Sequence, residues 1–245
     1  MFTAKGNYTL VTTRITKMAF ELKSVVPWGR NMGEYKIMFD LSNDDLNHKI
    51  ISFGDGPASF NYEMTKLGKS VTSLDPIYQF VKDEIQQRIA ETKDTILEQI
   101  HNNRDKFLWT TIKSIPDLEH IRMEAMNAFI EDFELGKVQG RYVCHELPMV
   151  TEFKDLSFDL GLSSHFLILY AGLGLDFHLK SISEMLRICK EIRIFPLLNL
   201  NGHESEVLKE IIAYFESDFE INIHKVDYEF QKGGNRLLKI TRRVK

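Results

Sequence analysis

Apolar positions recur along the chain in two patterns, one typical of strands and one typical of amphipathic helices. The strand-like runs are short, almost continuously apolar and bounded by Gly, Pro, Asp or Ser, as expected of strands buried on both faces. They comprise residues 49–54, 70–75, 141–146, 158–164 and 191–198. After the first run, residues 58–67 have apolar positions at helical spacing and end before Gly68, a typical helix stop. Strands that alternate with helices predict an α/β fold with a central, mostly parallel sheet and helices on both faces.

The pattern predicts a single domain over residues 1–245 with two additions. Residues 1–47 precede the first core strand; they combine a helical pattern with a segment broken by Pro and Gly, and we interpret them as an N-terminal flank or lid. Residues 82–138 exceed what a crossover helix needs, and their apolar spacing, interrupted at Pro116, predicts a helical insertion. Residues 220–242 contain Lys-Gly-Gly-Asn between two strand patterns, which predicts a C-terminal antiparallel hairpin.

Composition and charge narrow the classes of function. The chain has 245 residues, 43% of them apolar, and a formal net charge of -4 without a long basic run, which disfavours nucleic acid as a partner. No apolar run has the length of a membrane span, and the N-terminus lacks a signal-type core, so we expect a cytoplasmic protein. Cys144 and Cys189 have no metal-ligand or redox spacing, so we expect small core residues in a reducing compartment and no metal site. The sequence does not decide between a monomer and a homodimer.

The loop after the first strand reads Gly-Asp-Gly-Pro. Gly54 and Gly56 remove side chains where the strand turns into a helix, and Pro57 suits the first helical position. In open α/β sheets ligands bind beyond the carboxyl ends of the strands, where this loop is expected. Asp75 closes the second strand, from which an acidic side chain can accept hydrogen bonds from ribose hydroxyls.

Each of these signals also has an ordinary structural explanation, since a Gly-x-Gly turn is often only a turn and an Asp before Pro often only caps. Together, in one strand–loop–helix–strand unit, they favour a nucleotide-type ligand. A dinucleotide loop has a third glycine where this chain has Ser59. Asp55 adds a carboxylate that would repel a diphosphate but could pair with an ammonium group, which favours a cationic amino-acid nucleoside.

Several segments together resemble a known family. They are "IISFGDGPASF", "VTSLDPIY", "ELP", "FDLGLSSHFLILY", "EIRIFPLL" and "FQKGGNRLLKI". From about residue 25 to the end, apart from the insertion, the chain resembles a class I S-adenosylmethionine-dependent methyltransferase of a bacterial branch with unknown substrates. The resemblance implies a Rossmann-like methyltransferase fold, S-adenosylmethionine as the cofactor, and transfer of a methyl group to an unidentified acceptor.

The resemblance also implies which residues would hold the cofactor. Gly54, Asp55 and Gly56 would pack against its methionine part, Asp75 would hold the ribose, Ile77 would lie near the adenine, Glu146 and Leu147 would flank the adenine edge, and Ser163 with Ser164 would face the sulfonium. Arg30, in "PWGR", could pair with the cofactor's carboxylate, although a surface turn explains this motif as well.

The sequence offers one candidate catalytic base. His165 directly follows the fourth strand, and its pKa range suits proton transfer near neutrality, but a histidine that only caps a helix or hydrogen-bonds within the loop explains it equally well. Methyl transfer needs an aligned acceptor more than a protein nucleophile. On charge grounds we expect a small-molecule acceptor. Two other functions remain open: a non-catalytic S-adenosylmethionine-binding or regulatory protein, and an NAD-binding oxidoreductase.

Overall fold

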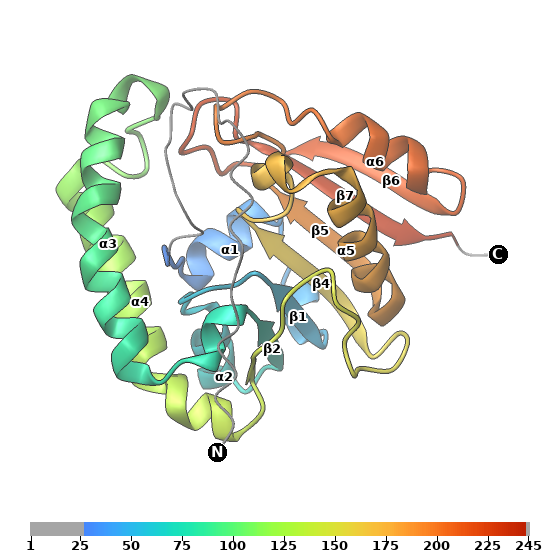
Figure 1. Ribbon diagram of the computed structural model, residues 1–245, viewed down its shortest axis with the longest axis horizontal. Coiled ribbons are helices and arrows are strands. Elements are labelled where there is room, and N and C mark those ends of the chain that lie inside the picture. Colours follow the sequence, from blue (N-terminus) through green and yellow to red (C-terminus); the bar gives the residue numbers. More distant parts are fainter. Residues whose placement is uncertain (1–26, 244–245) are drawn as a thin grey trace, which may run out of the picture.

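The central sheet has seven strands within the part of the chain that the structure, a computed structural model, describes, residues 27–243. The helix expected within residues 13–25 lies outside the described residues. The strand order is β3-β2-β1-β4-β5-β7-β6 (Figure 1). The strands are β1 Ile50–Phe53, β2 Val71–Leu74, β3 Tyr142–Val143, β4 Phe158–Ser164, β5 Cys189–Phe195, β6 Phe219–Lys225 and β7 Arg236–Arg242.

The direction of the strands confirms the predicted fold class. Strands β1 to β5 pair in parallel, whereas β7 runs antiparallel to both β5 and β6. This is a Rossmann-like methyltransferase sheet with a C-terminal antiparallel hairpin. The third strand is shorter than expected: β3 holds two residues at the sheet edge, and Cys144 after it is exposed, which corrects its expected place in the core.

Helices cover both faces of the sheet because successive strand residues point to opposite sides. The helices are α1 Met32–Met38, α2 Phe60–Lys66, α3 Lys82–Asn102, α4 Ile115–Val138, α5 Leu175–Ile188 and α6 Leu208–Phe215. Ile51 and Phe53 pack with α5 and α6 in one core cluster, whereas Ile50 packs with α1 and α2 in the cluster on the other face.

Residues 82–138 form two long helices, α3 and α4, which stand beside the sheet at its β3 side (Figure 1). Their connection, residues 103–114, is called the insertion connection below. An aromatic cluster attaches α4 to the sheet edge: Phe129 and Phe133 contact Tyr142 of β3, and Tyr78 lies against all three rings. Such buried aromatic pairs contribute about 0.5–1.5 kcal/mol each beyond their burial.

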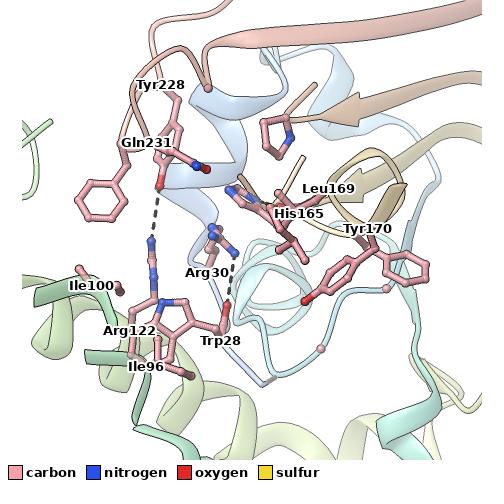
Figure 2. A pocket seen from close by; sticks show the side chains of 18 of the residues that line it. Trp28, Arg30, Ile96, Ile100, Arg122, His165, Leu169, Tyr170, Tyr228 and Gln231 are labelled. Atoms are coloured by element: carbon pink, nitrogen blue, oxygen red, sulfur yellow. Dashed lines mark hydrogen bonds between the residues drawn. The ribbon is translucent and has the colours of Figure 1, made fainter. Parts of the chain in front are cut away.

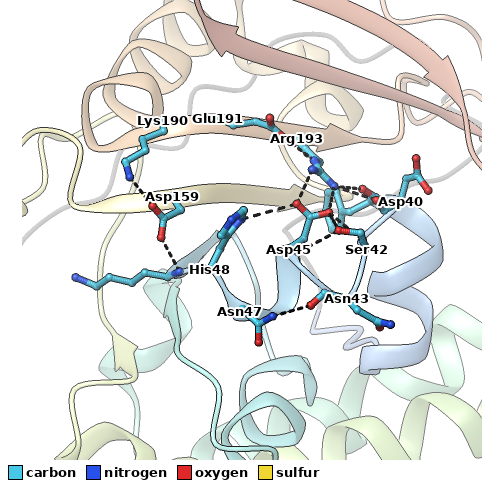
Figure 3. A network of polar contacts seen from close by, with 12 residues as sticks. Asp40, Ser42, Asn43, Asp45, Asn47, His48, Asp159, Lys190, Glu191 and Arg193 are labelled. Carbon is cyan, nitrogen blue, oxygen red and sulfur yellow. Dashed lines mark hydrogen bonds and ion pairs between the residues drawn. The ribbon is translucent and has the colours of Figure 1, made fainter.

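The described part of the N-terminal flank is held to the sheet by one buried arginine. Arg193 of β5 is 6% exposed and donates to the carbonyls of Phe39 and Asp40, at 2.8 and 3.0 Å. Its guanidinium also pairs with Asp45 at 3.0 Å and Glu191 at 2.7 Å (Figure 3). Because these partners satisfy the buried charge, the end of α1 and the turn after it are fixed against β5.

Candidate active site

A cavity of about 190 Å³ opens at the carboxyl ends of β1, β2 and β4 (Figure 2). Its walls include the loop Gly54–Pro57, the flank residues Trp28 and Arg30, and the segment after β4, residues 164–170. Helix α3 with the insertion connection and the connection between β6 and β7, residues 226–235, line it as well. The last of these is called the hairpin connection below. The cavity therefore lies where open α/β sheets bind ligands.

The two glycines of the loop have different surroundings. Both adopt left-handed backbone conformations, with φ of 64° at Gly54 and 54° at Gly56. A Cβ at Gly54 would lie 2.6 Å from the ring of Phe166, so this glycine permits close packing inside the protein. A Cβ at Gly56 would meet nothing within 4 Å, so here the backbone stays open to the cavity.

Asp55 is anchored beneath the loop, although part of it lines the cavity. It is 6% exposed, and its carboxylate accepts hydrogen bonds from the hydroxyls of Ser52 and Ser73, both at 2.5 Å, and from Tyr35 of α1. Burial raises the pKa of Asp55 above its ordinary value, against the effect of these donors. Three hydroxyls thus already engage this carboxylate, and its pairing with an ammonium group stays a prediction.

Asp75 follows β2 and faces the loop. Its carboxylate accepts the backbone N–H groups of Gly56 at 2.9 Å and of Ile77 at 2.8 Å. An ionised carboxylate has about four acceptor positions, so two are left for donors from a ligand. Burial raises the pKa of Asp75 to about 6, despite the two backbone donors.

Two N–H groups of the loop before α2 already have acceptors. Besides the Gly56 N–H, which is bonded to Asp75, the Ser59 N–H donates to the carbonyl of Arg30 at 3.0 Å. A diphosphate is usually held by free N–H groups of this kind at a helix start. This loop is therefore poorly suited to a diphosphate.

His165 directly follows β4 and points into the cavity beside Arg30 (Figure 2). Its φ of 52° is uncommon for a residue other than glycine, and such backbone strain often marks functional sites. Burial, and secondarily the charges of Arg30 and Arg122, lower the pKa of His165 well below its ordinary value, so the imidazole is neutral at pH 7.

Ser164 sets the orientation of this imidazole. The Ser164 Oγ lies 2.8 Å from Nδ1 of His165 and 3.9 Å from the sulfur of Met38. When the hydroxyl donates to that sulfur, its oxygen accepts the Nδ1–H of His165. Nε2 then carries a lone pair toward the cavity, as a general base requires.

Arg30 and Arg122 differ in how their charges are satisfied. Arg122 of α4 is 1% exposed and forms a two-pronged ion pair with Glu34 of α1, at 2.5 and 2.7 Å, while Tyr228 also donates to Glu34 at 2.9 Å. Arg30 donates only to the Trp28 carbonyl, at 3.3 Å, and its buried Nε has no partner among the described residues. Within residues 27–243 its guanidinium therefore has no acidic partner and can bind an anion in the cavity.

The insertion connection and the hairpin connection meet over the cavity. The Leu108 N–H donates to the Phe230 carbonyl at 2.7 Å, and the Lys232 N–H donates to the Lys106 carbonyl at 2.9 Å. The rings of Phe107 and Phe230 stack with centroids 4.9 Å apart. These two segments, far apart in the sequence, thereby roof the side of the cavity away from the sheet.

The cavity gathers some of the predicted site residues and leaves others outside. Gly54, Asp55, Gly56, Asp75, Arg30 and His165 line it. The residues expected at the adenine lie elsewhere: Ile77 packs against the insertion, Glu146 is exposed and Leu147 is 6% exposed in the core. Ser163 is fully buried with its Oγ unpartnered, whereas its neighbour Ser164 lines the cavity.

Among the residues around the cavity that the sequence did not predict are Tyr35, Arg122 and Tyr228. For Arg122 a signal was available. It lies four residues from both Leu118 and Met126, on the buried face of its helix, where a charged side chain is rarely found without a partner. Nothing local in the sequence marks the other two, because their partners Asp55 and Glu34 are distant in the chain.

The sheet order is that of a Rossmann-like methyltransferase fold, and the cavity lies at the carboxyl ends of its parallel strands. Solved structures similar to the chain include a TehB-like SAM-dependent methyltransferase from Corynebacterium glutamicum, with TM-score 0.47, 16% identity, and coverage of 86% of this chain and 88% of that one. Another is a SAM-dependent methyltransferase from Methanosarcina mazei, with TM-score 0.43, 13% identity, and coverage of 81% and 94%. No protein-family model matches the chain.

One curated relative shows the family. It is Uncharacterized protein MJ0045 of Methanocaldococcus jannaschii, 38% identical over 223 residues, which cover 90% of this chain and 98% of the relative. The chain belongs to the same family as this archaeal protein. The expected placement in a bacterial branch is not supported, since this relative is archaeal.

Proposed function

We propose that the protein is an S-adenosylmethionine-dependent methyltransferase that acts on a small molecule. The observation that carries the proposal is the meeting of the Gly54–Pro57 loop, Asp75 and His165 in one cavity at the carboxyl ends of β1, β2 and β4. The unpaired Arg30 fits a ligand with a carboxylate, and the free acceptor positions of Asp75 fit one with ribose hydroxyls.

Different residues contact different parts of the cofactor. Arg30 pairs with its carboxylate, the loop of Gly54, Asp55 and Gly56 packs against its methionine part, and Asp75 accepts the ribose hydroxyls. The adenine lies beyond Asp75, toward Ile77, Glu146 and Leu147, and the sulfonium lies near the end of β4 at Ser164, since Ser163 is buried in the core. When bound, S-adenosylmethionine supplies an activated methyl group. His165 accepts the proton of the acceptor at Nε2.

The segments that cover the cavity favour a small-molecule methyl acceptor over a polymer. The hydrogen bonds between the insertion connection and the hairpin connection, together with the Phe107–Phe230 stack, enclose the side opposite the sheet. A polymer would have to separate these segments to reach His165. Within residues 27–243, no helix combines the length and the apolarity that crossing a membrane requires.

An oxidoreductase that uses NAD is the weaker candidate. Its diphosphate needs free backbone donors in the loop that leads into α2, and here Asp75 and the Arg30 carbonyl already accept the Gly56 and Ser59 N–H groups. A buried carboxylate, Asp55, also lies in the loop.

Calorimetric titration with S-adenosylmethionine, S-adenosylhomocysteine and NAD tests the proposal. We expect the first two to bind with micromolar affinity and NAD not to bind. Asp75→Ala should weaken the binding of both nucleosides by at least about tenfold, because it removes the carboxylate that accepts hydrogen bonds from the two ribose hydroxyls. Asp176→Ala, at an exposed position of α5, is the matched control and should bind as the wild type does.

The result that would refute the proposal is failure of the wild-type protein, folded by circular dichroism, to bind either nucleoside. Binding of both without methyl transfer to any acceptor in a broad screen would instead favour a non-catalytic binding protein.

A further inference from the structure

The two edges of the sheet differ in length and in what lies beside them. At one edge β3 holds only two residues, and the insertion helices stand next to it (Figure 1). At the other edge β6 holds seven residues, and among the described residues it pairs on one side only, with β7. The register of β6 with β7 runs without a bulge, and the strand contains no proline. A long, regular edge of this kind is a template for a further strand.

The backbone groups of β6 that face away from β7 can be identified. Along an antiparallel strand, residues alternate between those that bond to the neighbour on one side and those that face the other side. Val226, directly after β6, donates its N–H to the Asn235 carbonyl at 2.9 Å. By alternation, the even-numbered residues of β6 bond to β7, and the odd-numbered ones direct their N–H and C=O groups outward. In agreement, the Phe219 carbonyl accepts a hydrogen bond at 3.3 Å from the side chain of Arg243.

The order of residues along β6 fits a second copy of the same strand. When two β6 strands pair antiparallel about Asn222, Ile221 lies opposite Ile223 of the second copy, and these outward-facing residues exchange both backbone hydrogen bonds. Glu220 then lies opposite His224 of the second copy, so no like charges face each other. A shift of the register by one residue would set outward-facing residues against residues that already bond to β7.

An apolar groove follows the same edge, on the face of the sheet that α6 covers. Phe219, Ile221 and Ile223 line it together with Ile212 of α6, and Ile223 is 37% exposed. Phe219 and Ile221 pack against the core cluster that contains α6. Antiparallel pairing would set Ile221 and Ile223 of the two copies side by side in this groove and so continue the core cluster across the new pair of strands.

We infer that two copies of the chain associate edge to edge through β6 and form a symmetric dimer with one continuous sheet. The two-fold axis passes beside Asn222. A second copy is the partner that this edge fits, because the apolar, polar and charged residues of β6 complement the same strand in the reverse direction. The association is independent of the proposed cofactor, which lies at the carboxyl ends of β1, β2 and β4.

Disulfide cross-linking tests the register in a Cys144→Ser background, which removes the exposed native thiol. Asn222 is exposed, and the pairing places it opposite itself with Cα atoms about 4.5 Å apart, a distance that a disulfide can bridge. Glu220, also exposed, is displaced from its own copy by about 14 Å along the strand, which is too far. Asn222→Cys should therefore form a covalent dimer at least about tenfold faster than Glu220→Cys. Equal rates for the two variants would overturn the inference.

Sedimentation equilibrium measures the association itself. The wild-type protein should have twice the mass of one chain at micromolar concentration. Ile223→Lys should raise the dimer dissociation constant at least about tenfold, because it sets a charge against Ile221 of the second copy. Leu135→Lys, at an exposed position of α4 beside the opposite edge of the sheet, should leave the dimer intact (Figure 1). A monomeric wild type, or a dimer that Ile223→Lys leaves unchanged, would overturn the inference.

Discussion

The raised pKa of Asp75 predicts that cofactor binding weakens in mild acid. The ribose hydroxyls are donors, so they need the ionised carboxylate, and only the fraction of protein with ionised Asp75 binds well. Burial raises the pKa of Asp75 to about 6 in the free protein. The affinity of the protein for the cofactor should therefore approach its maximum above pH 6 and decrease as the pH falls through that value.

The size of the effect follows from that pKa. At pH 7 about nine-tenths of the Asp75 carboxyls are ionised, and at pH 5 about one-tenth. If protein with protonated Asp75 does not bind, the apparent Kd increases about tenfold between these two pH values, or about 1.4 kcal/mol. The titration of His165 is displaced from that of Asp75, since burial lowers the pKa of His165 well below its ordinary value.

Calorimetric titration of S-adenosylhomocysteine at pH 5 to 7 measures this change, in buffers with different ionisation enthalpies to count protons taken up or released. Asp75→Asn should bind more weakly than wild type at pH 7 but show no dependence on pH. A wild-type Kd that is constant across this range would refute the assignment of Asp75 to the ribose. If the Kd of Asp75→Asn still depended on pH, the titrating group would instead be Asp55, because burial raises the pKa of Asp55 as well.

Two further predictions concern residues at the cavity wall. Glu34→Gln should lower the free energy of unfolding in urea by about 3–5 kcal/mol, because it leaves the buried Arg122 without its counter-charge. Glu124→Gln, at an exposed position of α4, the helix that carries Arg122, should change this free energy by less than about 0.5 kcal/mol, and equal effects of the two substitutions would contradict the reasoning. At pH 7, ¹⁵N NMR should show that the imidazole of His165 is neutral and carries its single proton on Nδ1. Ser164→Ala should remove this tautomer preference, and an unchanged spectrum would exclude Ser164 as the residue that orients the ring.

Local patterns in the sequence are sufficient to predict the parallel sheet. Short apolar runs bounded by turn residues identify strands well, since burial on both faces makes them continuously apolar. Four of the five runs contain β1 to β4, and the fifth, 191–198, overlaps β5, which begins two residues earlier at Cys189. The segment with Lys-Gly-Gly-Asn, 220–242, matches the antiparallel pair β6 and β7 except for Phe219. Only β3, with a partner strand on one side, is much shorter than its apolar run suggests.

The site is harder to predict because it depends on contacts between distant segments. The pattern of β4 shows that two serines end the strand, but not which faces the cavity; alternation places Ser163 in the core and Ser164 toward the ligand. Likewise, no local signal shows that Phe107 will meet Phe230, because that contact depends on how the insertion lies against the hairpin.

The roof of the cavity has a consequence for how this family can diversify. The loop that is proposed to hold the cofactor is part of the parallel sheet's own connections, whereas the roof comes from two segments that the sheet does not need for its pairing. Changes in the length or residues of the insertion connection and the hairpin connection would reshape the roof of the cavity and leave the loop Gly54–Pro57 as it is. Relatives that share the sheet and the loop can therefore evolve differently shaped cavities by altering these two segments together.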